Sequence, residues 1–387
     1  MLSPLGLAPS FGFGDRLGLA TPGHIVAVRA TNFAPIFAQQ SVRENARTGR
    51  TPQDVIDDAK RAVDAAQWDS AWGADADHLK ILEDIPPFVE AGYTFFTVDP
   101  GEHVDNAADD DSQDTLEKKS AIFDWDELSA LYLKDRRVEA WGRFEVDSLR
   151  RAVVKYGRAI QHTVEMFQRL SNLRDVFDFE VSVDETDAPT TPLEHFFIVN
   201  ELIRQGVKFT SLAPRFIGRF EKGVDYIGDL DALDAELAKH AAVTAYFGNY
   251  KLSLHSGSDK FSVYPLIRKY WGERIHVKTA GTSYLEALRV IAAHEPDLFL
   301  RIYSLGRERY EVDKKTYHVS AELSCLPHTD HLPLILDDFH AREVLHVTFG
   351  SALAQFGKEI RAALQKHADA YCTGLQIHFE KHLNLLK

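Results

Sequence analysis

Short apolar runs rich in β-branched and aromatic residues alternate with longer amphipathic segments along the chain, up to about residue 293. Such runs, roughly four to eight residues long and bounded by turn residues, are typical of buried strands. The sequence therefore predicts eight strands, at Gly6–Phe13, Pro35–Gln39, Ser70–Asp75, Tyr93–Val98, Phe177–Val183, Val207–Ala213, Tyr250–His255 and Arg274–Thr279.

The segments between these strands have the spacing and the capping residues of helices. Thr51–Trp68 and Thr191–Gln205 both begin with Thr-Pro, an N-cap followed by proline at the first helical position, and Gly206 ends the second. Because a helix between two strands returns the chain to the start of the sheet, neighbouring strands are expected to run parallel. Further helices are predicted at Val146–Leu170, Leu230–Phe247 and Thr282–Ala293.

Eight parallel strands joined by helices favour a (β/α)8 TIM-type barrel over a doubly wound sheet. We expect residues 1–293 to form this catalytic barrel. Residues 294–387 are expected to form a mostly helical C-terminal extension packed on the barrel. A ninth strand-like run, Val344–Phe349, lies within that extension.

The segment Asp105–Trp141 interrupts the alternation after the fourth strand. It begins with an acidic, polar run, Asp105–Asp114, which lacks the central glycine and terminal glutamate spacing of a calcium loop. We expect the run to be a solvated loop. The whole insertion is long enough to act as a lid over the barrel mouth or to decorate its side, and the sequence leaves both open.

Composition restricts the partners of this barrel. The chain of 387 residues has the apolar and charged content of an ordinary globular protein, and its net charge of −14 argues against a nucleic-acid or anionic-membrane partner. No apolar run approaches the roughly 20 residues of a membrane span, and the N-terminus lacks a signal-peptide pattern. We expect a cytoplasmic protein with two free thiols, Cys325 and Cys372, and homo-oligomerisation is left open.

The active site of a barrel lies at the carboxyl ends of its strands. Three histidines, His78, His255 and His276, occur at such ends beside carboxylates, which predicts a divalent metal. Zinc, manganese, nickel and iron all suit these ligands. Asp77 and Glu180 are either partners that orient the histidines or a general base and acid on opposite sides of a substrate.

An anionic substrate would need a local basic pocket in so acidic a protein. Arg215, Lys222 and Lys278 form a candidate set. The glycine-rich start GFGDRLG is interpreted as a tight loop that places Asp15 and Arg16 near the mouth, because it lacks the P-loop and dinucleotide spacings. Further substrate contacts are expected from other strand ends, at Gln40 and Asp259.

Motifs along nearly the whole chain resemble the tagaturonate epimerase family. They include SFGFGDRLGLATPGH, PIFAQQSVRENARTGRT, GADADHLK, FTVDPGEHV, FDFEVSVDET, RFIGRFEKGVDY, LSLHSGSDKFSVYP, HVKTAGTSYLEALRVI, YHVSAELS and LHVTFGSAL. Members of that family carry a leading segment before the first motif, whereas this chain begins almost at it. The resemblance implies interconversion of D-tagaturonate and D-fructuronate with a divalent cation.

The resemblance also assigns roles to single residues. It implies Asp77 as proton acceptor and Glu180 as proton donor. It implies His78 and His255 as metal ligands, with His276 as the expected third ligand. Lys222 is a further candidate contact to the ketohexuronate substrate.

The inverted carbon of this substrate is β to the ketone, so simple deprotonation beside a carbonyl cannot invert it. We favour cleavage and re-formation of the bond between the α and β carbons, with two-base proton transfer at carbon as the rival. A metal-dependent ketose isomerase or aldolase acting on a sugar acid is the alternative function. A sugar-acid-binding protein without catalysis is disfavoured, because it would not need a paired acid and base.

Overall fold

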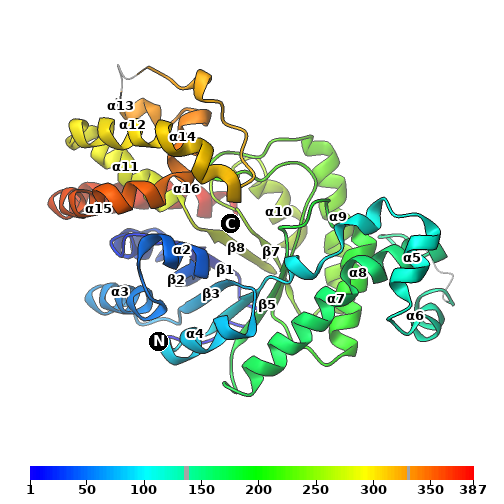
Figure 1. The fold of residues 1–387 in the computed structure, drawn as a ribbon. Coiled ribbons are helices and arrows are strands. Elements are labelled where there is room, and N and C mark those ends of the chain that lie inside the picture. Colours follow the sequence, from blue (N-terminus) through cyan, green and yellow to red (C-terminus); the bar gives the residue numbers. More distant parts are fainter. Residues whose placement is uncertain (135–138, 329–331) are drawn as a thin grey trace.

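The computed structural model describes residues 1–134, 139–328 and 332–387, and it confirms the predicted barrel (Figure 1). Parallel strands pair in chain order, and the eighth pairs with the first to close the ring. The strands are β1 (Ser10–Phe13), β2 (Ala34–Ser41), β3 (Gly73–Leu79), β4 (Phe95–Val98), β5 (Asp178–Val183), β6 (Ser211–Pro214), β7 (Lys251–Leu254) and β8 (Ile275–Thr279).

Helices lie between most of these strands and form the outer layer. Thr51 and Thr191 are the N-caps of α3 and α8, as predicted, and in the structure each also forms a capping box with the carboxylate three residues later. Each cap satisfies backbone N–H groups that a helix start would otherwise leave unpaired. Apart from the insertion after β4, the α-helices up to β8 and directly after it are α1 (Thr21–Val28), α2 (Val42–Thr48), α3 (Pro52–Ala65), α4 (Ile85–Ala91), α7 (Val146–Ser171), α8 (Pro192–Arg204), α9 (Leu230–Phe247), α10 (Tyr264–Trp271) and α11 (Thr282–His294).

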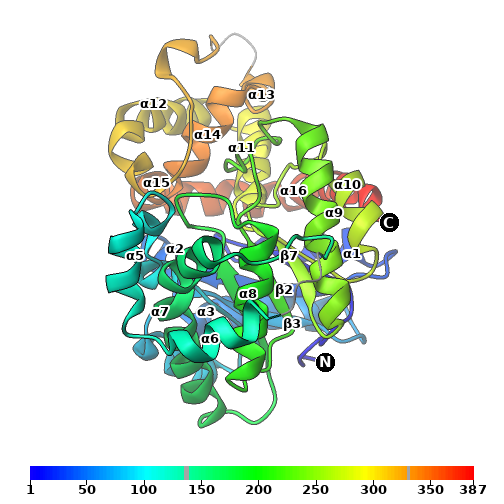
Figure 2. The same cartoon turned by 90° about the vertical axis from the view of Figure 1, so that its right-hand side faces the viewer.

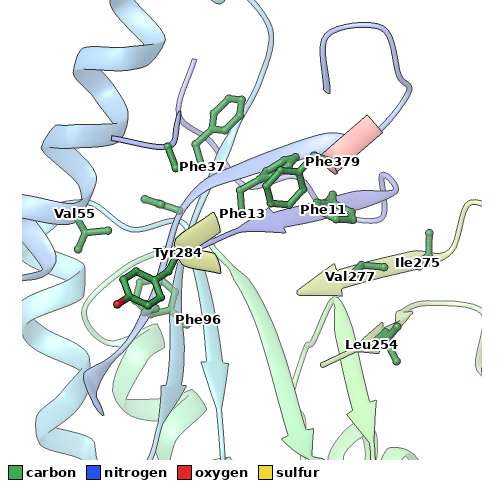
Figure 3. Packing of buried hydrophobic residues seen from close by; sticks show 14 of the residues in the cluster. Phe11, Phe13, Phe37, Val55, Phe96, Leu254, Ile275, Val277, Tyr284 and Phe379 are labelled. Atoms are coloured by element: carbon green, nitrogen blue, oxygen red, sulfur yellow. The ribbon is translucent and has the colours of Figure 1, made fainter. Parts of the chain in front are cut away.

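The C-terminal extension lies on one side of the barrel, at the top of Figures 1 and 2. Its last helix packs against α1 and α10, which is where a barrel helix between β8 and β1 would lie. Phe379 of this helix meets Phe11 and Phe13 of β1, with ring centroids 6.1 Å and 5.0 Å away (Figure 3). One apolar core therefore runs through barrel and extension. The helices of the extension are α12 (Pro296–Asp313), α13 (Leu332–Ile335), α14 (Phe339–Val347), α15 (Phe349–Lys366) and α16 (Ala368–Leu385).

The prediction of a ninth strand-like run at Val344–Phe349 is wrong. The run forms the end of α14 and the start of α15. Every residue of α14 from Ala341 to Val347 is buried, so the apolar stretch reflects a helix enclosed by protein. Periodicity cannot separate such a helix from a buried strand over so few residues.

The insertion after β4 packs on the outside of the barrel. Its helices α5 (Gln113–Ser120) and α6 (Trp125–Tyr132) lie against α7. Two carboxylates of the acidic run, Asp105 and Asp111, share one partner, Lys119, at 2.8 Å and 2.6 Å. Within the described ranges, no helix is long and apolar enough to cross a membrane, and both cysteines are free thiols.

Candidate active site

A buried ammonium group joins three of the polar residues at the barrel mouth. Lys278 of β8 lies 2.7 Å from carboxylate oxygens of both Asp75 and Asp77 on β3, and 3.0 Å from Glu180 on β5. It also donates to Thr97 of β4. All these side chains point inward, because residues at alternate strand positions face the barrel interior.

The charges in this cluster shift one another's protonation. Burial opposes ionisation of Asp77, but His78 and Lys278 outweigh it and hold the pKa of Asp77 well below its usual range. Burial raises the pKa of Asp75 to about 7 against the attraction of Lys278. Asp77 is therefore the ionised base of the pair at neutral pH, whereas burial favours the protonated form of Asp75.

Two histidines and a carboxylate meet beside this cluster. Asp184 lies just after β5, and its carboxylate oxygen is 3.5 Å from Nε2 of His78 and 3.2 Å from Nδ1 of His255. One ligand atom from each residue lies within 4.8 Å of the other two. Two non-glycine residues here have positive φ, His78 (53°) and Ser256 (49°), a conformation that is concentrated at functional sites.

This group fits a divalent metal. The other ring nitrogen of each histidine is held by a carboxylate, since His78 Nδ1 is 2.8 Å from Asp77 and His255 Nε2 is 2.7 Å from Glu180. A carboxylate behind the imidazole fixes the tautomer that a metal needs. Burial lowers the pKa of His78, but Asp77 and Asp184 outweigh it and raise that pKa well above its ordinary value. The same negative potential favours a divalent cation.

Two cavities open at this end of the barrel. The outer one, about 210 Å³, reaches from Asp184 and His255 to Arg215. The inner one, about 30 Å³, is lined by Asp77, His78 and Lys278. Lys222, His255 and Ser256 line both, so the two are adjacent.

The outer cavity contains two cations without a carboxylate partner. In the part of the chain that the structure describes, no ion pair or side-chain hydrogen bond involves the half-buried guanidinium of Arg215. The Lys222 ammonium donates to the Ser256 hydroxyl at 2.6 Å and contacts no carboxylate there. Cations without a carboxylate partner in a cavity are suited to bind an anion, so the predicted role of these two residues stays a prediction that the geometry allows.

Four residues predicted as substrate contacts are engaged elsewhere and do not line either cavity. The Asp15 carboxylate accepts backbone N–H groups of its own loop, including that of Gly18 at 2.7 Å. Arg16 is buried in an ion pair with Glu44 at 2.8 Å. Gln40 accepts from Arg50 at 3.1 Å. The fourth, Asp259, is paired with Arg342 at 2.9 Å and His378 at 3.1 Å.

His276 lies deeper in the barrel than the group formed by His78, Asp184 and His255. It pairs in register with Ser10, and its Nδ1 is 2.9 Å from the Ser10 hydroxyl. It stands two positions before Lys278 on β8, which places it roughly 6–7 Å further from the mouth than Lys278. Burial lowers the pKa of His276 to about 3. The structure therefore places this histidine apart from the group formed by His78, Asp184 and His255.

Asp77 and Glu180 differ in whether their side chains reach a cavity. Asp77 lines the inner cavity, whereas Glu180 is fully buried and lines neither cavity. Glu180 lies behind His255 and Lys278, and its second oxygen accepts from Ser211 at 2.6 Å. Asp77 can reach a bound molecule directly, while Glu180 can act on one through its neighbours.

Sequence reasoning missed three site features. Asp184 stands at a strand end but was given no role as a ligand. Gln39, not Gln40, lines the inner cavity, and the alternation of strand residues decides between them. A segment of the extension, Thr316–His318, lines the outer cavity, and no strand-end signal marks it.

A second group of possible ligands, Asp259, His378 and His382, has its ligand atoms within 4.8 Å. At least one of its ligand atoms is already engaged within the protein, because Nε2 of His382 accepts a hydrogen bond from the backbone N–H of Asp259 at 3.0 Å. The Arg342 guanidinium beside the Asp259 carboxylate also opposes a cation. We interpret this group as the attachment of α16 to the loop after β7.

Comparison with known proteins identifies relatives over the whole chain. Residues 3–386 match the tagaturonate epimerase family, UxaE. A tagaturonate/fructuronate epimerase of Thermotoga maritima is 44% identical over 391 residues, which cover 99% of this chain and 81% of that protein.

Solved structures agree. The native crystal structure of fructuronate-tagaturonate epimerase UxaE from Cohnella laeviribosi has a TM-score of 0.95 at 39% identity, covering 100% of this chain and 83% of that one. A probable tagatose 6 phosphate kinase from Sinorhizobium meliloti 1021 shares only the fold, with a TM-score of 0.55 at 11% identity over 98% of this chain and 100% of that one. The chain belongs to the tagaturonate epimerase family.

Proposed function

We propose that this protein is an isomerase that interconverts D-tagaturonate and D-fructuronate, as its relatives are named for doing. One observation carries the proposal. An ionised base, Asp77, stands beside a two-histidine, one-carboxylate group, and the adjoining cavity contains the unpaired cation Arg215. A ketohexuronate needs all three: a base, a site for its ketone and hydroxyl oxygens, and an anchor for its carboxylate.

His78, Asp184 and His255 would hold a divalent metal. When bound, the metal acts as a Lewis acid that polarises the ketone and neighbouring hydroxyl oxygens of the substrate. Asp77 and Glu180 orient the two imidazoles from behind. Zinc, manganese, nickel and iron all remain compatible with this donor set.

In the preferred reaction, Asp77 removes the proton of the β-hydroxyl. The bond between the α and β carbons then breaks, its electron pair moves toward the ketone, and the β carbon becomes an aldehyde. Rotation of the aldehyde presents its other face, the bond re-forms, and the new alkoxide takes a proton back. No proton is exchanged at the inverted carbon itself.

Lys278 connects the two proposed proton-transfer residues. Its ammonium lies 2.7 Å from Asp77 and 3.0 Å from Glu180, and these carboxylates raise the pKa of Lys278 against its burial. Lys278 therefore stays charged and holds both carboxylates in place, while buried Glu180 contacts the metal-ligand group through His255. We expect Asp77→Asn and Glu180→Gln to stay folded, with turnover reduced on the order of 10²–10⁴-fold.

The activity is tested by incubating purified, metal-loaded protein with D-tagaturonate and following D-fructuronate by NMR. Formation of fructuronate supports the proposal. Formation of an aldose or of cleaved three-carbon products instead would favour a sugar-acid isomerase or aldolase.

The same reaction in deuterated water separates the two mechanisms. Carbon–carbon bond cleavage leaves the inverted carbon with its original hydrogen. Deuterium at that carbon would establish two-base proton transfer at carbon and rule out the preferred route.

A further inference from the structure

A short segment of the C-terminal extension spans the barrel mouth. We call Thr316–Ala321 the strap. It begins at the last residue of the 3-10 turn Lys314–Thr316, which follows α12. One end contacts α2, which follows β2, and the other contacts Glu221, which follows β6. In a ring of eight strands, the second and the sixth lie on opposite sides. The strap therefore crosses over the mouth of the barrel.

Two arginines of α2 hold the first end. Arg47 donates to the Thr316 hydroxyl at 2.8 Å and to the Tyr317 hydroxyl. Arg43 donates to the Thr316 carbonyl at 3.3 Å. Both guanidiniums also lie 5.0 Å from the centre of the Tyr317 ring, within the range of a cation–π contact. This end is fixed by charge-assisted contacts.

Two buried carboxyl groups hold the second end. The Ser320 N–H lies 3.0 Å from oxygens of both Glu221 and Glu343, and the Ala321 N–H donates to Glu343 at 2.8 Å. Burial and the contact with Glu221 raise the pKa of Glu343 to about 8. At neutral pH Glu343 is therefore protonated, and the two acids can bind the strap without repelling each other.

His318 lies between these two ends and lines the outer cavity. Over the described residues, its imidazole has no hydrogen-bond or ion-pair partner. The Arg215 guanidinium, which lines the same cavity, also has no such partner within the described parts of the chain. Such groups can bind a ligand without first breaking a contact within the protein.

We propose that the strap is a specificity-determining wall of the substrate site, in which His318 acts with Arg215 to bind the carboxylate end of the ligand. The ketone end would lie at His255 and Asp184, on the inner side of the same cavity. The identity of the ligand rests on the proposed function. The placement of a carboxylate under the strap rests on the cavity alone.

The test is calorimetric binding of D-tagaturonate and of the neutral ketose D-tagatose to the full chain with Mn²⁺. An Asp77→Asn background slows turnover during the titration, and the parent for each comparison carries the same change. We expect His318→Ala to weaken tagaturonate binding on the order of 10-fold, the size of a lost charge-assisted hydrogen bond, with tagatose affinity unchanged within about twofold. His328→Ala, an exposed histidine of the same extension, is the control and should change neither.

Equal affinity of His318→Ala and its parent for tagaturonate, or an equal loss for both sugars, would overturn the proposal. The comparison remains informative if the unmutated protein fails to epimerise tagaturonate, because it measures affinity rather than turnover. In that case the proposed function would fail while the strap could still bind a carboxylate.

A second pair of variants tests the hold on the strap. Glu343→Ala removes the acceptor for the Ser320 and Ala321 N–H groups, whereas Glu343→Gln keeps an acceptor oxygen and can donate to Glu221. We expect the alanine variant to weaken tagaturonate binding on the order of 10-fold and the glutamine variant to match its parent. Identical affinities for both variants would show that Glu343 does not position the strap.

Discussion

Lys278 was predicted from its strand as a substrate contact, yet in the structure it holds three carboxylates together. Asp75, Asp77 and Glu180 would repel one another if all were ionised without it. Burial opposes the charged form of Lys278, but these carboxylates outweigh it and raise its pKa. The ammonium therefore contributes to folding by balancing the buried carboxylates.

Replacing Lys278 with methionine should destabilise the protein by about 3–5 kcal/mol, because it leaves buried carboxylates without their counter-charge. The free energy of unfolding can be measured in urea. The loss should be larger at pH 8 than at pH 5, since Asp75 and its neighbours can take up protons at the lower pH. Lys222→Met, which removes an ammonium without a carboxylate partner, should cost less than about 1 kcal/mol. Equal stability of the two variants would contradict this account.

Metal content distinguishes the ligand set predicted from the sequence, which includes His276, from the group in the structure, which includes Asp184 instead. After chelation and reconstitution, His255→Ala and Asp184→Ala should each lose most of the bound metal, measured by atomic emission. His276→Gln should keep it, because its ring lies below the group and is bonded to Ser10. Metal loss in His276→Gln together with retention in Asp184→Ala would restore the ligand set predicted from sequence.

The sequence identifies which residues stand at strand ends but not how deep each one lies. His276 and Lys278 both face the barrel interior, and the register with β1, which sets Ser10 beside His276, shows how far His276 lies from the mouth. Gln39 and Gln40 are neighbours with opposite orientations, so an error of one residue exchanges cavity for core. Asp184 was visible in the sequence, but its pairing with two histidines depends on distances between β3, β5 and β7.

Helix α16 is a structural part of the barrel as much as of the extension. Truncating Phe379 to alanine should cost about 3–5 kcal/mol, because its ring is fully buried against Phe11 and Phe13. Ile377 on the same helix is exposed, and its alanine variant should change stability by less than about 0.5 kcal/mol. Thermal unfolding of the two variants compares them directly.

The stability of the protein should fall as the pH rises, because Glu343 at the end of the strap loses its proton. Glu343 faces Glu221, whose other oxygen is 3.2 Å from Arg219, and Tyr310 of α12 lies nearby. Since the pKa of Glu343 is raised in the folded protein, its favourable protonated state is fully present below about pH 4 and is lost as the pH rises through about 8. Wild type should lose stability relative to Glu343→Gln over that interval. Parallel pH profiles for the two proteins would exclude this titration.

Strands and barrel helices were predictable because their signals are local: β-rich runs, Thr-Pro caps and glycine stops. The strap was not, because its position depends on contacts with α2, with the loop after β6 and with α14, which lie far away in sequence. The strand-like run at Val344–Phe349 was misjudged for a related reason. The run is apolar because other helices enclose it, and the residues of the run alone do not show which elements surround them.

Barrel and extension share one apolar core, so we expect them to unfold together. Calorimetry should give one transition whose calorimetric and van't Hoff enthalpies agree. Phe379→Ala should shift that whole transition to lower temperature. Two resolved transitions would show instead that residues 1–293 and 294–387 are energetically separate.

The position of α16 also affects how the protein is made. During synthesis β1 leaves the ribosome early, but the helix that covers it emerges only after α11 to α15 have been translated. Until then the ring of Phe11 and its neighbours would face water, and such exposed apolar surface attracts chaperones or other nascent chains. The strands of the barrel can therefore form in chain order, but β1 is covered only when α16 has been made. Slow release of the nascent chain would prolong the time during which this apolar surface is exposed and prone to aggregation.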